Sequence, residues 1–412
     1  MESEICKKEK CTGCYACVNA CKHHCISMQE DEFGALHPVI DEVNCIHCNL
    51  CIKSCPNNVD IAFNRPMTCY AAWNDNNNQR KICASGGIGS IMAEYVLRHK
   101  GVLFGSRYNK QMIPIMTYTE DVEELEYFKG SRYVQSLVGK ETFQKVKSFL
   151  KENRLVLFIG TPCQIAGLKT FLHKDYANLI TVDLICHGVC PTKYLTEEVT
   201  FLSNKYNLKD VSDIRFRGND GNNFRLTLWN KDRRKLFPRD NYRERLPGGN
   251  ISDQYYILGF LWGVSLRENC YTCNYARPER VADITIGDFI GLGTFSPFPY
   301  KRDNVSSVFV NTVSGQKFYN SVSTWKESLR NVKREYEERL VYKPSLLEAF
   351  QRHPKYFPFV ENYKRYGFAK GIRLTLKDDV RKQEVRNTID LWRLIYKIPR
   401  KIYRKLSNIH GK

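Results

Sequence analysis

Two runs of four closely spaced cysteines constrain the fold of this chain more than any other feature. The first run has the spacing C-x2-C-x2-C-x3-C and comprises Cys11, Cys14, Cys17 and Cys21. The second run repeats this spacing 34 residues later and comprises Cys45, Cys48, Cys51 and Cys55, followed by Pro56. Such close spacing lets three thiolates converge on one metal centre from a single tight loop. Zinc sites are the alternative, but they place C-x2-C pairs on longer loops. The duplication therefore predicts iron–sulfur ligation at two sites.

The spacing of the two runs resembles the motif of the bacterial two-cluster ferredoxins. In that family the first three thiolates of a run bind one 4Fe-4S cluster, and the fourth binds the other cluster. The resemblance implies one ligand set of Cys11, Cys14, Cys17 and Cys55, and a second of Cys45, Cys48, Cys51 and Cys21. Lys22 replaces the proline that normally follows the first run, which changes a turn and not the ligation. Cys6 and Cys25 fit no position of the motif.

Composition limits the class of protein. The chain has 412 residues, of which 42 % are apolar and 26 % charged, which predicts two or three globular domains. No apolar run approaches the roughly 20 residues of a membrane-spanning helix, and the first ten residues lack the apolar stretch of a secretory signal. Its 17 cysteines are odd in number and clustered, which favours metal ligation in a reducing compartment over a disulfide framework. We therefore expect a cytoplasmic protein.

After Pro66 the pattern changes to short apolar runs that alternate with amphipathic stretches, as in α/β folds. Residues 155–160 and 179–186 have the composition of buried parallel strands on either side of a helix. Thr161 suits the N-cap of that helix, and Pro162 suits its first turn.

Four further cysteines form a possible third metal site. Cys163 follows one of these strands and Cys186 ends the next, and the carboxyl ends of strands are where open α/β sheets bind ligands. Cys270 and Cys273 add a C-x2-C pair. From the residues alone, a redox-active Cys163 beside half a zinc site is an equally good interpretation.

Five ordered segments together resemble the coenzyme F420 hydrogenase/dehydrogenase beta-subunit family. They are ASGGIGS (84–90), KGSRYVQS (129–136), GTPCQIAGL (160–168), ICHGVCP (185–191) and CYTCNYARPERVADITIGDF (270–289). With the ferredoxin-like front, the resemblance extends over about residues 1–330. It implies a central α/β domain, with a parallel or mixed sheet and flanking helices, that carries flavin and iron–sulfur chemistry. It also implies that Cys163, Cys186, Cys270 and Cys273 bind a third 4Fe-4S cluster, with Cys190 as the alternative to Cys186.

The same resemblance implies FAD. The candidate contacts are Ser85, Gly86, Gly87, Lys129, Gly130, Ser131, Tyr133, Ser136 and Asp288. Residues 85–87 and 129–131 are glycine-containing loops ahead of helical stretches, which suits close approach of backbone N–H groups to a pyrophosphate. Ordinary turns are the alternative. Asp288 is a polar contact to the flavin or substrate, or else a helix cap. His187 is a proton donor or a structural histidine.

Charge is unevenly distributed along the chain, whose formal net charge is +19. Residues 1–66 carry six basic and nine acidic residues, and residues 371–412 carry twelve and four. Residues 215–245 hold ten basic and four acidic residues, which suits a solvated hairpin or a rim that attracts an anionic substrate. No nucleic-acid motif accompanies this charge.

The C-terminal tail has a basic amphipathic pattern that is broken at Pro399. It either packs on its own domain or lies on an anionic membrane surface. Its apolar positions are Ile389, Leu391, Trp392, Ile395, Ile398, Ile402 and Leu406.

We therefore expect three regions. Residues 1–66 form a small α+β two-cluster ferredoxin-type domain, residues 67–340 a flavin and iron–sulfur oxidoreductase domain, and residues 341–412 a basic helical extension. The expected function is an oxidoreductase that passes electrons between a ferredoxin-like donor or partner redox subunit, its 4Fe-4S clusters, FAD and a small-molecule substrate. An electron-relay subunit without substrate chemistry, and a non-redox protein of glycan or envelope synthesis with structural clusters, are the alternatives. No role is assigned to Cys6, Cys25, Cys69, Cys83 or Cys190.

Overall fold

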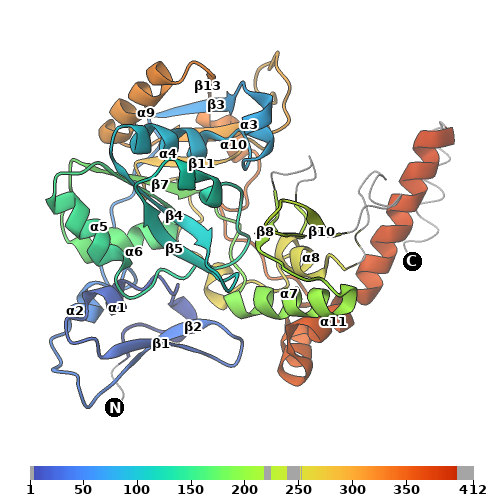
Figure 1. The fold of residues 1–412 in the computed structure, drawn as a ribbon, viewed down its shortest axis with the longest axis horizontal. Helices are drawn as coiled ribbons and strands as arrows, with labels where there is room; N and C mark the ends of the chain where they lie inside the picture. The colour runs from blue at the N-terminus through green and yellow to red at the C-terminus, as the bar shows by residue number, and fades with distance from the viewer. Residues whose placement is uncertain (1–3, 218–223, 239–250, 252, 397–412) are drawn as a thin grey trace. The chain divides into compact units, whose positions relative to one another are not determined.

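The computed structural model describes residues 4–217, 224–238, 251 and 253–396 (Figure 1). The chain forms two compact units. Unit 1 comprises Met1–Thr192, Arg215–Asn223 and Leu266–Gln351, and unit 2 comprises Lys193–Ile214, Phe224–Ser265 and Arg352–Lys412.

An eight-stranded mixed sheet forms the centre of unit 1. Its strands are β3 (Thr68–Asn74), β4 (Val102–Tyr108), β5 (Pro114–Thr119), β6 (Val156–Gly160), β7 (Leu179–Leu184), β11 (Ile284–Asp288), β12 (Ser306–Val310) and β13 (Leu329–Arg334). Their order in the sheet is β13-β3-β12-β11-β7-β6-β4-β5. Strands β11, β7, β6 and β4 run parallel, and β12 is antiparallel to both β11 and β3. The carboxyl ends of β3, β11, β7, β6 and β4 therefore lie on one edge, and the predicted α/β fold with flanking helices is confirmed.

Helices cover both faces of this sheet. Side chains alternate between the faces along a strand, so Leu103 packs with α4 and α9, whereas Phe104 packs with α5 and α6. The longer helices of unit 1 are α4 (Ile88–Arg98), α5 (Thr142–Lys151), α6 (Pro162–Leu172) and α9 (Val313–Trp325). Its shorter ones are α3 (Asn77–Lys81), α10 (Tyr336–Leu340), η2 (Glu123–Phe128) and η4 (Glu268–Cys270).

The predicted start of α6 is confirmed. Thr161 is the N-cap residue, Pro162 opens the first turn, and the Thr161 N–H donates to Gln164 Oε1 over 3.0 Å. This reciprocal capping satisfies N–H groups that the first turn otherwise leaves unpaired. The cap also places Cys163 directly after β6.

The front of the chain packs against α5 and α6. It contains η1 (Lys8–Lys10), α1 (Ala16–Ala20), the antiparallel pair β1 (Ile26–Glu30) and β2 (Leu36–Ile40), and α2 (Leu50–Lys53). Asn19 of α1 is buried, donates to Gly139 O over 2.9 Å and accepts from the Phe143 N–H over 3.0 Å. One apolar core joins Val18 to Phe143 and Ile165. The front and the sheet thus share a core.

In its described residues, unit 2 combines a three-stranded sheet with helices, the longest of which is broken at Gly367. The strands are β8 (Asp213–Arg215), β9 (Thr227–Trp229) and β10 (Lys235–Phe237), and the helices are α7 (Thr192–Tyr206), α8 (Tyr255–Leu261) and α11 (Tyr356–Tyr396). Glu198 of α7 is buried and accepts two hydrogen bonds from Arg373 of α11. None of the helices formed by the described residues has the length and apolar character needed to cross a membrane.

The two basic segments are only partly described. Strands β8–β10 come from residues 213–237, whereas residues 218–223 and 239–245 of the basic stretch lie outside the described residues. Pro399, Ile398, Ile402 and Leu406 of the predicted amphipathic tail also lie outside them.

Candidate functional site

The first predicted cysteine set surrounds one buried cavity. Its lining includes Cys11, Cys14, Cys17 and Cys55. Gly13 and Tyr15 have left-handed backbone conformations, with φ of 63° and 64°, on either side of Cys14. These two residues bend the loop tightly enough for three cysteines of one run to meet Cys55 from the other.

The second predicted set surrounds a second cavity, lined by Cys21, Cys45, Cys48 and Cys51. The left-handed positions recur at His47 and Asn49, with φ of 52° and 60°, each 34 residues after its counterpart. The sequence repeat is therefore also a repeat of backbone conformation. Cys48 is exposed, whereas all four cysteines of the first set are buried.

The first set has the chemistry of a metal-thiolate site. Burial raises the pKa of Cys14 to about 12, and burial together with the charge of Cys14 raises the pKa of Cys17 well above its usual value. A bound metal stabilises such thiolates, because it supplies the positive charge that burial denies them. The buried hydroxyl of Thr12, next to Cys11, has no hydrogen-bond partner among the described residues. These residues fit an anionic cluster.

Each cavity also holds a fifth cysteine that the motif does not explain. Cys6 lines the first cavity, and its thiol lowers the pKa of Cys11 by hydrogen bonding. Cys25 lines the second cavity, and its Sγ lies 3.3 Å from Cys21 Sγ.

The third predicted set gathers at the carboxyl edge of the sheet. Cys163 follows β6, Cys186 lies two residues beyond β7, and Cys270 ends η4. Burial and the charges of Cys163 and Cys273 raise the pKa of Cys186 to about 12. Burial and the charges of Cys186 and Cys273 likewise raise the pKa of Cys270. The thiols of the third set thus influence one another electrostatically. Cys190, the alternative ligand, is completely buried.

The first and third sets lie next to each other. A Cβ atom on Gly167 of α6 would lie 2.9 Å from Cys14 Sγ, and Cys163 is one helical turn earlier on the same helix. Charge on Cys163 raises the pKa of Cys14. Tyr275 is buried, and the thiols of Cys163, Cys14, Cys273 and Cys55 all raise its pKa. The spacing of the motifs gave no sign of this proximity.

The first predicted flavin loop lies at the N-terminus of α4. Ser85 Oγ donates to Val305 O over 3.1 Å, and the Gly86 N–H donates to Ser306 Oγ over 2.9 Å. A Cβ atom on Gly86 would lie 2.3 Å from Ala72 O of β3, so the backbone of this strand leaves room only for glycine at position 86. Gly87 is the N-cap residue of α4, with φ of 81°.

The second predicted loop lies between η2 and α5. Residues 129–131 follow η2, and the next helix, α5, begins only at Thr142. Lys129 Nζ pairs with Glu126 Oε2 over 2.9 Å, and Gly130 has φ of 84°. Burial raises the pKa of the Tyr133 hydroxyl, and hydrogen bonding to Ser131 lowers it.

The two loops converge on the carboxyl edge of the sheet. Asp288 is the last residue of β11 and pairs with Arg217 Nη1 over 2.7 Å, so it does not cap a helix. In the sheet, Asp288 lies opposite Ser306 of β12, and the Ser306 hydroxyl accepts a hydrogen bond from the Gly86 N–H. Ser136 Oγ lies 2.6 Å from Ser106 Oγ of β4. His187, just past β7, contacts the ring of Phe350.

Two buried residues that sequence reasoning missed connect these motifs. Gln135 donates to Thr12 O and Gly13 O over 3.2 and 3.3 Å, and accepts from Arg267 Nη1 over 2.6 Å. Arg267 Nη2 also donates to Cys11 O over 3.1 Å. Position is the only signal in the sequence that points to them, because Gln135 adjoins Ser136 and Arg267 precedes Cys270 by three residues.

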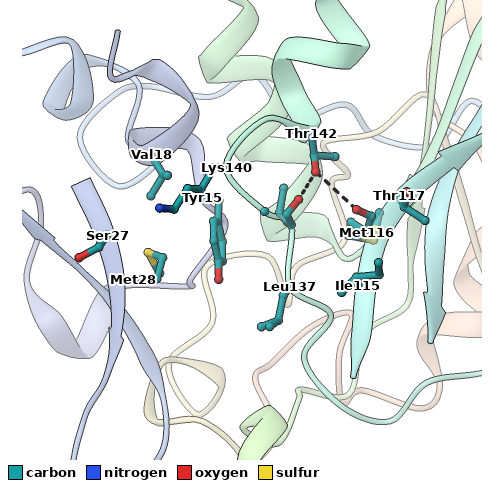
Figure 2. A pocket seen from close by; sticks show the side chains of 12 residues that line it. Tyr15, Val18, Ser27, Met28, Ile115, Met116, Thr117, Leu137, Lys140 and Thr142 are labelled. Atoms are coloured by element: carbon teal, nitrogen blue, oxygen red, sulfur yellow. Dashed lines mark hydrogen bonds between the residues drawn. The ribbon is translucent and has the colours of Figure 1, made fainter. Parts of the chain in front are cut away.

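A third cavity of about 470 Å³ holds no predicted site residue. Figure 2 shows Tyr15 and Met28 of the front region on one side and Leu137 and Met116 on the other. Tyr15 lines both this cavity and the first cysteine cavity.

Among the residues that the structure describes, no three His, Cys, Asp or Glu side chains are arranged to bind a single metal ion. A 4Fe-4S cluster accepts one thiolate at each of its four irons, so its ligands surround a cluster and do not share one ion.

Comparisons with known proteins agree with the two cysteine-rich regions. Residues 153–329 match the family model for the C terminus of the coenzyme F420 hydrogenase/dehydrogenase beta subunit, and residues 10–59 match the model "4Fe-4S dicluster domain". No curated protein matches the sequence. A chain of the F420-reducing NiFe hydrogenase complex from Methanosarcina barkeri is similar at 15 % identity and a TM-score of 0.43, over 77 % of this chain and 93 % of that one. The resemblance predicted from the motifs is confirmed.

Proposed function

We propose that this protein is an iron–sulfur flavoprotein oxidoreductase with three 4Fe-4S clusters and FAD. It passes electrons between a ferredoxin-like donor or partner redox subunit and a small anionic substrate. The ligands are Cys11, Cys14, Cys17 and Cys55 for the first cluster, Cys21, Cys45, Cys48 and Cys51 for the second, and Cys163, Cys186, Cys270 and Cys273 for the third. A flavin can exchange single electrons with the clusters and electron pairs with an organic substrate, so it would connect the two.

The observation that carries the proposal is the shared edge of the sheet. Cys163 and Cys186 follow the carboxyl ends of the neighbouring strands β6 and β7, where α/β sheets bind ligands, and Cys273 acts electrostatically on Cys186. Gly86 of the first glycine loop bonds to Ser306, which is paired with Asp288 at the carboxyl end of β11. Gly167 and Tyr275 bring that edge against the first cysteine set. A route for electrons from the front of the chain to the sheet therefore needs no further protein element.

The charge of the predicted flavin loops supports an anionic cofactor. Three cations lie in this region. Lys129 and Arg215 both pair with Glu126, and Arg217 pairs with Asp288. Lys129 and Arg215 also act electrostatically on Cys83. Cations at this position suit a pyrophosphate, and the positive end of the α4 helix dipole suits its oxygens. We assign the chain's part there to Ser85, Gly86, Gly87, Lys129, Gly130, Ser131, Tyr133, Ser136 and Asp288, which bind and orient the cofactor.

Anaerobic purification of the full chain tests the cofactor content. Three 4Fe-4S clusters require about twelve irons per chain, and we expect one FAD beside them. Cys273→Ser should reduce the iron content to about eight, because a hydroxyl is a poor ligand for iron of this kind. Cys69→Ala, a buried cysteine on β3, is the matched control and should retain all the iron.

Flavin content is measured separately. Lys129→Gln should lower the FAD bound per chain, whereas Lys140→Gln, an exposed lysine outside the loops, should not. A wild-type chain with about twelve irons and no flavin would favour a relay subunit over an enzyme. A screen of anionic oxidants for flavin reoxidation then identifies the substrate class.

We also propose a cytoplasmic location with peripheral contact to an anionic membrane through the basic tail. Residues 397–412 contain six basic residues and no acidic one. Removal of these residues should reduce sedimentation with anionic vesicles at low salt, because each basic residue near such a surface contributes about 1 kcal/mol. Equal binding by the truncated and full chains would contradict membrane contact.

A further inference from the structure

Arg267 is a buried cation between two cysteine sets. Its side chain is 2 % exposed, and it lies in the segment before η4, three residues ahead of Cys270. The N–H of Cys270 donates to the carbonyl of Arg267 over 2.9 Å. The guanidinium reaches the other way and donates to Cys11 O over 3.1 Å.

The acceptors of this guanidinium are all neutral. They are Gln135 Oε1 at 2.6 Å, Cys11 O at 3.1 Å, Asn269 Oδ1 at 3.1 Å and Leu36 O at 3.2 Å. No carboxylate among the described residues forms an ion pair with it. Arg280, which is equally buried, is paired with Asp183 over 3.2 Å.

A buried charge without a counterion strongly destabilises a protein. The chain therefore needs a negative charge near Arg267, and the groups beside it that can supply one include cysteines of two sets. The guanidinium of Arg267 donates to the carbonyl of Cys11, and the backbone carbonyl of Arg267 accepts from the N–H of Cys270. Cys11 belongs to the first set, and Cys270 belongs to the third.

We propose that Arg267 is the shared counter-cation of the first and third clusters and raises the reduction potential of both. The proposal rests on the third cluster of the proposed function. A 4Fe-4S cluster with four thiolates is an anion, and reduction adds one more negative charge to it. A cation in a buried, low-dielectric position stabilises that extra charge, and local charge is one of the determinants of cluster potential.

The position of Arg267 also makes the effect selective. Cys21, Cys45, Cys48 and Cys51 line a separate cavity, and neither Arg267 nor Gln135 is among the residues of its lining. The second cluster therefore serves as an internal reference within the same molecule.

The test is a redox titration of the full-length protein in which electron paramagnetic resonance monitors the reduction of each cluster. Arg267→Gln should lower the midpoint potentials of two of the three clusters and leave the third unchanged. Arg267→Lys keeps the positive charge, so the midpoint potentials of these two clusters should stay close to their wild-type values. Arg334→Gln, which removes a half-buried arginine paired with Glu338, is the control and should move none of the three.

A second variant keeps the guanidinium in place. Gln135→Glu puts a carboxylate 2.6 Å from Arg267 Nη1, so it neutralises the cation without removing it. Gln135→Glu should lower the same two midpoint potentials. It therefore tests the proposal even if Arg267→Gln does not assemble its clusters.

The outcomes separate the two proposals. Wild-type protein with about eight irons would contradict the third cluster, and with it the shared role. Wild-type protein with about twelve irons, but unchanged potentials in Arg267→Gln or Gln135→Glu, would overturn the role of Arg267 alone. Equal shifts in all three clusters would also overturn it, because they indicate a general change in structure.

Discussion

Gly13 and His47 occupy equivalent positions in the two cysteine loops, yet only one of them must be glycine. Both have a left-handed backbone. A Cβ atom on Gly13 would lie 2.5 Å from Gln135 Nε2, whereas position 47 carries an exposed histidine side chain. The contact with the α/β core, and not the loop conformation itself, therefore selects glycine at position 13.

This difference predicts unequal responses to alanine. Gly13→Ala should lower the free energy of unfolding by about 1–3 kcal/mol, because the side chain strains the left-handed backbone and displaces Gln135. It should also lower occupancy of the first cluster. His47→Ala is the matched control, since it alters a side chain at an already non-glycine position. Urea unfolding and iron assays measure both effects, and equal losses in the two variants would contradict the argument.

The fifth cysteines make a separate prediction. Cys6→Ser and Cys25→Ser should each retain the full iron content, because neither residue has a place in the repeated spacing. Iron and acid-labile sulfide per chain are the measurements. Loss of about four irons in Cys25→Ser would instead make Cys25 a ligand in place of its neighbour Cys21, 3.3 Å away.

At the scale of elements, α6 connects the front of the chain to the sheet. It carries Cys163 at its start and Gly167 at its contact with Cys14. Glycine within a helix costs about 1 kcal/mol relative to alanine, so its presence here reflects the close approach of α1. The same glycine therefore controls the separation between the first and third cysteine sets.

Gly167→Ala should be destabilising despite the gain in helix propensity. The added methyl would lie 2.9 Å from Cys14 Sγ and 3.0 Å from Cys14 Cβ, so α6 and α1 must move apart. We expect a loss of about 1–3 kcal/mol in unfolding free energy and lower occupancy of the first cluster. Gly89→Ala on α4 is the control, because its methyl would meet only the flexible end of Ile286, at 3.2 Å. A neutral or stabilising effect of Gly167→Ala would contradict this argument, because it would show that α6 and Cys14 can move apart at little cost in free energy.

Sequence and structure agree where the signal is local. The spacing of the cysteine runs, the cap at Thr161–Pro162 and the strands around α6 all depend on residues close together in the chain, and each could be predicted. Arg267 and Gln135 could not, because they meet across 132 residues and neither belongs to a spaced pattern. The glycine at 167 was a usable signal, since a glycine inside an apolar helix usually has a packing reason.

At the scale of the whole molecule, the cysteines of the front are part of the core of unit 1. Cys14, Cys17, Cys21 and Cys55 pack in the same apolar cluster as Phe143, Phe158 and Ile165. The apolar contacts of unit 2 are different, with Tyr256 and Phe359 both against Phe368.

Removal of iron should therefore affect the two units unequally. Chelation under oxidising conditions leaves buried thiols without their metal, which removes the stabilisation that cluster binding adds to the folded state. Amides of α1, α5 and α6 should lose protection in hydrogen exchange, while those of α8 and α11 should keep it. Uniform loss of protection over both units would contradict this expectation, and unchanged protection of α1 would show that the clusters are not structural.

The shared core of the front and the sheet imposes an order on the maturation of this protein. The loop from Cys11 to Cys17 is covered by α6, with Cys14 against Gly167. We expect a preformed cluster to be delivered most readily before that helix docks, with the docking of α1 on α6 following it. A cell that produces the polypeptide faster than its assembly machinery supplies iron and sulfide would accumulate chains with this interface open, and an exposed α6 face is a surface prone to aggregation.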